Sequence, residues 1–322
     1  MRHGPCGGAQ RDGRCEVGDR GCPFVAPGRT WVPPPPPVAA ALARVPFVPP
    51  RVLVDVREPT GVGHDSRRLW RDVASVLVRA TALVGEHADH VDDAARPAVP
   101  EVIHLLAAGG VRTVATITGR DRRPESIRDD VVALHRAGVL AVHCVTGDHP
   151  RALGIDRSPQ WGGESLDIIR ACVAAGVVAG AAESPASPGP RVERVLAKER
   201  AGAAMVVLNH GGDARRLVDF ARRCRDAGAM IPLLAPVPVV VDPHTAARLD
   251  RFPGLELPPG LTAAVAGASR PRAEGIARAV ALAGELVQSG AFAGINVSGP
   301  AGIASAGERL AVTAELLDAL RV

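Results

Sequence analysis

Two aspartates, each placed shortly after an apolar run, are the residues of this chain best suited to chemistry. Asp121 follows the β-branched run that ends at Thr118, and Asp148 follows the apolar run 141–145. A segment with helical spacing joins the two runs, which gives the order strand, loop, helix, strand, loop. Parallel strands joined by a helix place both following loops at the carboxyl edge of one sheet, where ligands of such sheets bind. We therefore expect Asp121 and Asp148 to face one shared mouth.

The same alternation of apolar runs and helical segments continues from residue 51 to the end of the chain. Strands are expected at 51–56, 89–93, the run ending at 118, 141–145, 177–182, 204–209, 231–236 and 293–297. Helices are expected at 66–85, 99–108, between the third and fourth strands, and at 164–175, 191–201, 214–227, 243–251, 272–289 and 305–320. This order predicts an α/β fold, a (β/α)8 TIM barrel, although by itself it also permits a doubly wound sheet.

Composition limits the class of protein. The 322 residues are 47% hydrophobic but only 2% aromatic, with no Tyr, so the core is expected to consist of Ala, Val and Leu. The net charge of +4 comes from scattered basic residues, which does not suggest a nucleic-acid partner. No apolar run is long enough to cross a membrane and no signal-peptide core is visible, so we expect a cytoplasmic protein without a membrane partner. In that compartment its six cysteines are thiols or metal ligands rather than disulfides.

Three of these cysteines fall in a Gly-rich amino-terminal piece. Cys6, Cys15 and Cys22, with His3 as a fourth candidate, could bind zinc or another metal and order a piece too short to build a core. Their spacing is not that of a zinc ribbon, and free thiols in a docking tail are the alternative. We expect a short Cys-rich extension at 1–30, a Pro-rich linker at 31–50 and the barrel at 51–322.

The two aspartate loops resemble those of a known family. Thr118-Gly119-Arg120-Asp121-Arg122 and Val145-Thr146-Gly147-Asp148-His149 are similar to the "TCRDR" and "LTGDH" motifs of the 5,10-methylenetetrahydrofolate reductase family, especially its bacterial and archaeal branch. The amino-terminal piece resembles the "GPCGG…G.CE…C" module of methylenetetrahydrofolate-reductase-associated proteins, which typically belongs to a separate domain or partner subunit. The resemblance implies a TIM barrel, and either a homo-oligomer or a partner subunit.

The activity implied by this resemblance is that of an oxidoreductase acting on CH–NH donors. Reduced FAD, with NADH or NADPH as the electron donor, would reduce the small-molecule substrate 5,10-methylenetetrahydrofolate to 5-methyltetrahydrofolate, the methyl source for methionine. Asp55 stands where the family carries a glutamate that donates the proton, and it is one methylene shorter. Glu58 is a second candidate for the acid. A structural role for Asp55, bonding the turn at Gly61, is the alternative.

The resemblance also places ligand positions on other strands. It implies that Thr118, Asp148, Ala181 and Lys198 contact the cofactor, with Lys198 near the flavin phosphates unless it is an ordinary surface lysine. It implies that Asp121 and Asn209 bind the substrate, because a carboxamide suits the donor and acceptor edge of a pterin.

Several ligand positions depart from the family pattern. Glu183 replaces a common tyrosine, Arg194 and Ala197 replace an asparagine and an arginine, and His210-Gly211-Gly212 and Asn296 replace aromatic residues. Two alternative functions therefore stay open. One is a folate-binding or accessory homologue without flavin, and the other is a folate-dependent enzyme of methyl-group catabolism.

Overall fold

Eight parallel strands close into a barrel in chain order, with β8 pairing with β1. The computed structural model describes residues 9–10, 12–15, 17–22, 25, 47–56, 64–85, 97–149, 160–245, 255–298 and 305–321. The strands are β1 (Val52–Val56), β2 (Thr81–Val84), β3 (Arg112–Thr118), β4 (Ala141–Val145), β5 (Ala179–Glu183), β6 (Ala203–Leu208), β7 (Leu233–Pro238) and β8 (Gly294–Ser298). The predicted TIM barrel is confirmed.

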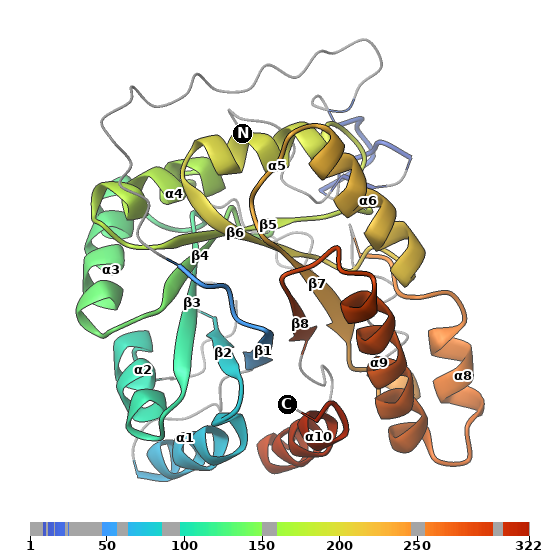
Figure 1. Cartoon of the computed structure of the whole chain (residues 1–322). Helices are drawn as coiled ribbons and strands as arrows, with labels where there is room; N and C mark the ends of the chain where they lie inside the picture. Colours follow the sequence, from blue (N-terminus) through green and yellow to red (C-terminus); the bar gives the residue numbers. More distant parts are fainter. Residues whose placement is uncertain are drawn as a thin grey trace.

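Helices surround the barrel, as Figure 1 shows. They are α1 (His64–Leu77), α2 (Val99–Ala108), α3 (Pro124–Arg136), α4 (Ser165–Ala174), α5 (Arg191–Arg200), α6 (Ala214–Asp226), α8 (Leu261–Gly267), α9 (Pro271–Gln288) and α10 (Ala306–Ala319). Asp213 caps α6 by accepting a hydrogen bond from the backbone N of Arg216 at 3.0 Å, as its position before the helix leads one to expect. Among the described residues no helix is both long and apolar enough to cross a membrane.

Alternate residues of each strand build two separate apolar regions. On β1, Val52 and Val54 face the helices, while Leu53 faces the barrel interior. The outer region is the larger one and packs the sheet against its helices. The inner region contains one or two small aliphatic side chains from most strands, namely Leu53, Leu83, Val114, Ala141, Met205, Val207 and Leu234. Because these side chains are short, the barrel is filled without aromatic residues from its own strands.

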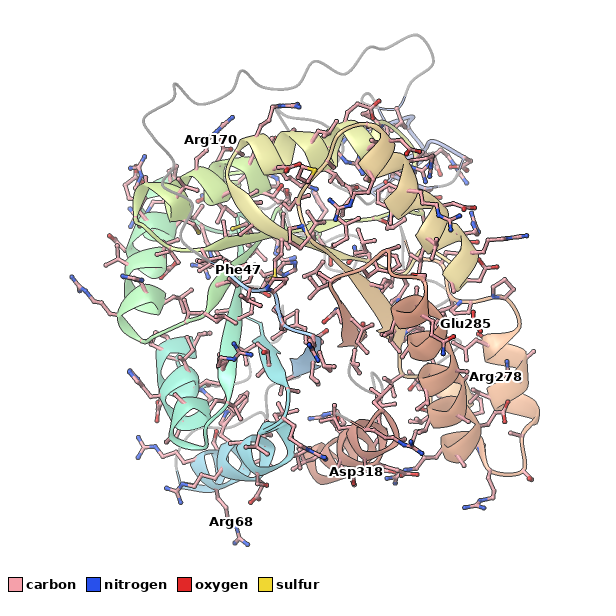
Figure 2. The ribbon with its side chains drawn as sticks, viewed as in Figure 1. Phe47, Arg68, Arg170, Arg278, Glu285 and Asp318 are labelled. Atoms are coloured by element: carbon pink, nitrogen blue, oxygen red, sulfur yellow. The ribbon has the colours of Figure 1, made fainter. Side chains whose placement is uncertain are left out.

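Phe47 packs against this inner region together with Leu140 and Val178, which precede β4 and β5. It therefore closes the amino-terminal end of the barrel. Figure 2 shows Phe47 near the centre of the molecule, whereas charged side chains such as Arg170, Arg278 and Asp318 point outward from the helices. Phe47 lies in the segment predicted as linker, so the last part of that segment packs on the barrel.

The second strand was predicted wrongly. Its expected position, 89–93, lies outside the described residues, and the strand that pairs with β1 and β3 is Thr81–Val84. This strand lies within the segment predicted as the helix 66–85, which ends at Leu77 instead. Apolar residues at 76, 77, 80 and 83 fit a helical period, but a turn, in which Ala80 N donates to Leu77 O at 2.9 Å, separates the two elements.

The remaining elements agree with the prediction within two residues, apart from α8 and the helix expected at 243–251. Helix α8 was not predicted. Of the expected helix 243–251, only residues 243–245 are described, and they are helical. Glu183, which was assigned to a loop, is the last residue of β5.

Helix α9 contains two glycines in contrasting surroundings, and they give a test of this packing. A Cβ at Gly275 would lie 1.8 Å from the carbonyl O of Val240, whereas a Cβ at Gly284 would meet nothing within 4 Å. We expect Gly275→Ala to lower the free energy of unfolding by at least about 2 kcal/mol through overpacking. Gly284→Ala, the matched control, should raise it by about 0.5–1 kcal/mol because alanine favours the helix. Urea denaturation measures both, and equal effects of the two variants would contradict the close packing of α9 on the segment that follows β7.

Candidate active site in the barrel mouth

The loops after β3 and β4 meet at the carboxyl ends of the strands, which we call the mouth. Gly119 N donates to Val145 O at 3.2 Å, and Arg120 Nη1 donates to Asp148 O at 2.6 Å. Gly147 has a φ of 89°, and a Cβ there would lie 3.1 Å from the Cβ of Arg120. A glycine is needed at 147 both for its backbone conformation and for this close approach. The structure thus brings the two predicted aspartate loops together.

Asp121 is held by the loop that follows β4. Its φ is 56°, its backbone N donates to Gln160 O at 2.6 Å, and its carboxylate lies 3.6 Å from Nε of Arg120. Arg120 is itself almost fully buried and pairs with Trp161 through an isolated bridge. Asp148 is exposed at the mouth. Arg120 therefore helps to position both aspartates, through the backbone carbonyl of Asp148 and the carboxylate of Asp121.

A second group of side chains points into the barrel from four strands. Asp55, Thr116, His143 and Asn296 each lie between two residues that pack on the helices, so each faces the interior. Asp55, Thr116 and His143 each lie two residues beyond an apolar residue of the inner region on the same strand. Asn296 lies two residues beyond Gly294, which is the register partner of the inner-region residue Leu234. We call these four residues the inner polar layer. The sequence analysis named Asp55 as the acid and Asn296 as a changed ligand position, and it missed Thr116 and His143. Polar residues at alternate positions of a buried strand are the signal that could have found them.

The other predicted ligand positions occupy different places. Thr118 faces inward above Thr116, is 1% exposed, and its hydroxyl has no hydrogen-bond partner within the described chain. Asn209 is exposed at the end of β6, where its backbone N donates to Glu183 O at 2.8 Å. Ala181 packs between the sheet and the helices and is 0% exposed. The structure therefore brings Asp55, Thr118, Asp148 and Asn209 to the mouth, and it does not bring Ala181 there.

Lys198 takes part in a buried ion cluster with Glu183 and Arg194. Its Nζ donates to Glu183 Oε2 at 2.8 Å and to the carbonyl O of Ala182, and Arg194 Nε donates to the same carboxylate at 3.0 Å. Arg194 also donates to Glu183 Oε1, which makes the contact bidentate. Burial alone would raise the pKa of Glu183, but the two cations outweigh it and lower the pKa to about 2. Burial lowers the pKa of Lys198, which Glu183 opposes.

His210 connects the end of β6 to the end of β8. Its Nε2 lies 3.0 Å from the hydroxyl of Ser298, and its Nδ1 is buried without a partner in the part of the chain described. Burial lowers the pKa of His210 to about 4, so the ring is neutral at pH 7. The following residue, Gly211, forms a bridge with Glu256, which continues the wall of the mouth beyond β6.

The amino-terminal cysteines are only partly described. Cys15 and Cys22 are free thiols, in a segment where Ala9 pairs with Cys15 and Arg14 pairs with Gly21. Cys6 and His3 lie outside the described residues. Among the residues that are described, no three His, Cys, Asp or Glu side chains come together as metal ligands. A metal set that includes Cys6 stays a prediction.

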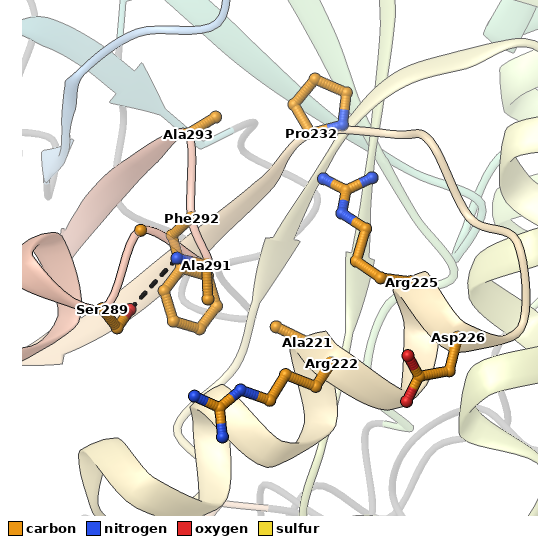
Figure 3. A pocket seen from close by; sticks show the side chains of 10 residues that line it. Ala221, Arg222, Arg225, Asp226, Pro232, Ser289, Ala291, Phe292 and Ala293 are labelled. Atoms are coloured by element: carbon orange, nitrogen blue, oxygen red, sulfur yellow. Dashed lines mark hydrogen bonds between the residues drawn. The ribbon is translucent and has the colours of Figure 1, made fainter.

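A hollow of about 470 Å³ lies at the opposite end of the barrel from the mouth. Figure 3 shows it between the end of α6, where Arg222 and Arg225 lie, and the segment that leads into β8, where Phe292 lies. The hollow is lined by residues that precede β7 and β8, so it does not communicate with the inner polar layer.

Comparison with protein families identifies this barrel. A sequence profile described as methylenetetrahydrofolate reductase matches residues 84–298, which is more than half of the chain and runs from the end of β2 to the end of β8. The chain belongs to the methylenetetrahydrofolate reductase family. A comparison with curated proteins gave no match.

One solved structure shares the fold at low sequence identity, and a second was found with a lower TM-score. An uncharacterised protein from Clostridium thermocellum, described as binding two copies of 5-methyl-5,6,7,8-tetrahydrofolic acid, is 9% identical with a TM-score of 0.60. The similarity covers 85% of this chain and 96% of that chain. A 2,3-dimethylmalate lyase is 16% identical with a TM-score of 0.46, over 85% of this chain and 82% of that chain. At 9% identity, the similarity to the Clostridium thermocellum protein supports the barrel fold of this chain and nothing more.

The buried ion cluster yields a stability prediction. Glu183→Gln removes the negative charge of the cluster and leaves the cations of Arg194 and Lys198 buried without it, so the free energy of unfolding should fall by about 3–5 kcal/mol. Glu274→Gln is the matched control, because Glu274 pairs with Arg278 at 2.7 Å on the exposed face of α9. Exposed pairs of this kind contribute less than about 1 kcal/mol. Similar losses for the two variants in chemical denaturation would refute the importance of the cluster.

The two buried histidines predict a pH dependence of stability. Burial lowers the pKa of His143 and of His210 from 6.5 to about 4, so below pH 6.5 the unfolded chain binds protons that the native protein does not. Stability should therefore fall as pH drops from 6.5 to 4, by about 3 kcal/mol per histidine. The lowered pKa of Glu183 affects the free energy of unfolding only below pH 4.5. The stability that the ionised carboxylate contributes is lost as the pH falls from 4.5 toward 2.

The window from pH 6.5 to 4.5 thus separates the effect of the histidines from that of Glu183. His210→Gln should reduce the slope of unfolding free energy against pH in this window by about one proton, as measured by urea denaturation at several pH values. An unchanged slope would mean that His210 is protonated in the native protein.

Proposed function

We propose that this protein binds a reduced folate in the barrel mouth and reduces the one-carbon group of 5,10-methylenetetrahydrofolate to the methyl group of 5-methyltetrahydrofolate. The observation that carries this proposal is the placement of Asp55, which faces the barrel interior at the end of β1 in a chain that belongs to the methylenetetrahydrofolate reductase family. The structural neighbour described as binding 5-methyltetrahydrofolate gives further support.

The reaction requires a hydride donor and an acid. A hydride adds to the one-carbon unit, one carbon–nitrogen bond of the five-membered ring breaks, and the released nitrogen takes a proton. A reduced nicotinamide supplies the hydride equivalent, and Asp55 supplies the proton. An acid held in the right position contributes about 10²–10⁴-fold to such a step.

Other residues of the mouth suit the binding of a folate. The exposed amide of Asn209 at the end of β6 and the carboxylate of Asp121 offer donors and acceptors to the pterin ring. Thr118 ends β3, and Asp148 follows the adjacent strand β4 at the same edge. These side chains lie at the ends of β3, β4 and β6 or in the loops that follow them, and the rigid sheet holds a bound ring in one orientation.

FAD, the cofactor implied by the resemblance, fits the described residues poorly at its phosphates. The cation expected there, Lys198, is bound to Glu183 and to the carbonyl O of Ala182, and it is 7% exposed. Arg194 of the same helix is 6% exposed and binds the same carboxylate. Cations committed to an internal carboxylate are not available to a diphosphate, so no catalytic step is assigned here to a flavin.

The ion cluster also favours a second candidate function. A family member that binds a folate without flavin, as an accessory subunit, would keep the polar mouth and would not need a phosphate site. The glycines at 211 and 212, which offer no side chain to stack on a second ring at the end of β6, are consistent with this candidate.

Substitution of the proposed acid tests the reaction. Asp55→Asn should lower kcat/KM for 5,10-methylenetetrahydrofolate at least 100-fold while the Kd for 5-methyltetrahydrofolate changes less than about threefold. Asp318→Asn, on the exposed face of α10, is the control and should leave both unchanged. Retention of more than about a tenth of the activity, a loss below about 1.4 kcal/mol, would remove Asp55 from this role.

The visible absorption spectrum of the purified protein separates the two candidates. Flavin bands that bleach with NADH or NADPH and recover with the folate would support a flavin-dependent reductase and overturn the interpretation of the ion cluster. A colourless protein that oxidises the nicotinamide with the folate supports reduction without flavin. A colourless protein that binds the folate without turnover supports the accessory function.

A further inference from the structure

The inner polar layer contains two buried polar atoms that lack partners. Asn296 is 7% exposed and His143 is 8% exposed, and both face the barrel interior. Within the described chain, Oδ1 of Asn296 and Nε2 of His143 have no hydrogen-bond partner. Native proteins rarely leave buried polar atoms unsatisfied, and such atoms call for an explanation. A ligand that enters from the mouth and bonds to them supplies one.

The ring of His143 is fixed by its neighbour on β3. Thr116 and His143 are register partners, and Oγ1 of Thr116 lies 3.3 Å from Nδ1 of His143. This contact leaves Nε2 as the ring atom able to reach a ligand. Burial, with a smaller effect from the charge of Lys198, lowers the pKa of His143 to about 4, so the imidazole is neutral at pH 7.

Asn296 approaches the same space from β8. Its register partners are Leu53 on β1 and Pro236 on β7, and the inward-facing Asp55 lies two residues beyond Leu53. The unpartnered atom of Asn296 is an oxygen, which accepts hydrogen bonds only. A ligand at this position must therefore present an N–H or O–H group to it.

The charge of the layer defines the class of ligand. Besides the carboxyl group of Asp55, the layer presents a neutral imidazole, an amide and a hydroxyl, and the nearby Lys198 is bound to Glu183. Such a set suits an uncharged ring with donors and acceptors on one edge, whereas a phosphate requires cations that are free to bind it. The adjoining inward side chains of β6 and β7, Val207 and Pro236, are apolar and suit the face of a ring.

We propose that the inner polar layer binds the edge of a neutral nitrogen heterocycle inserted into the barrel, with Oδ1 of Asn296 accepting from a ring N–H and Nε2 of His143 bonding to the same edge. This inference rests on the proposed function, and it then assigns Asn296 and His143 to the pterin ring of the folate. They are binding residues of the same layer as Asp55, deeper in the barrel than Asn209.

Asn296→Leu is the variant that tests this assignment. It removes the acceptor with little change of volume and also removes an unsatisfied buried oxygen, so the ligand-free protein should be at least as stable as wild type to urea. The Kd for 5-methyltetrahydrofolate, measured by isothermal titration calorimetry, should rise about 10- to 100-fold. His143→Leu should weaken binding to a similar degree.

Thr113→Val is the matched control. Thr113 also carries a buried hydroxyl without a partner in the described chain, but it lies on β3 between Arg112 and the inward-facing Val114, so it faces the helices. Its substitution should leave the Kd for 5-methyltetrahydrofolate unchanged.

Fragments separate the two halves of the folate. The wild-type protein should bind 6-methyltetrahydropterin, and Asn296→Leu should abolish that binding while the weak binding of p-aminobenzoylglutamate persists. Wild-type affinity for 5-methyltetrahydrofolate in both layer variants would overturn this inference and leave the proposed function standing. Pterin binding that depends on Asn296, without reduction of the methylene group, would support the inference and contradict the proposed reaction. A wild-type protein that binds neither the folate nor the pterin would contradict both.

Discussion

Closure of eight parallel strands is the constraint on which the structure depends. Closure leaves alternate residues of every strand facing a narrow interior, and it gathers all the loops that follow the strands at one end. The interior must be filled at its lower end to be stable. Here short aliphatic side chains and Phe47 fill that end, so the upper part can carry polar side chains that open to the mouth.

Charged and neutral polar side chains lie in different parts of this barrel. The ion cluster of Glu183, Arg194 and Lys198 lies between β5 and α5, where each charge has a partner. The inner polar layer is neutral apart from Asp55, because burial keeps His143 uncharged. Asp55 is therefore the one carboxylic acid of this layer, beside an imidazole, an amide and a hydroxyl.

Family membership and local structure together define the working hypothesis for function. The family profile spans β3 to β8, and the geometry places the acid of β1, which lies outside the profile, together with several amide, imidazole and hydroxyl groups inside the barrel. Glu183, which stands where the family resemblance implies a tyrosine, binds the lysine that was expected to contact a cofactor. Its ion pairs with Arg194 and Lys198 join α5 to β5.

The sequence by itself determined the α/β class, because apolar runs and helical periods alternate along the chain and each is set by local side-chain pattern. The family resemblance of the loop motifs favoured a barrel over a doubly wound sheet. It also placed the aspartate loops after β3 and β4 at one edge, which follows from parallel connection alone. It misplaced β2, since Thr81–Val84 is short enough to fit a helical period, and only pairing with β1 and β3 makes it a strand. Tertiary structure alone decided that Lys198 binds Glu183 and that Thr116, His143, Asn296 and Asp55 share one layer. Lys198 meets Glu183 only where α5 packs on β5. The four members of the layer come from strands that are far apart in the chain, and barrel closure with strand register turns all four toward the same interior.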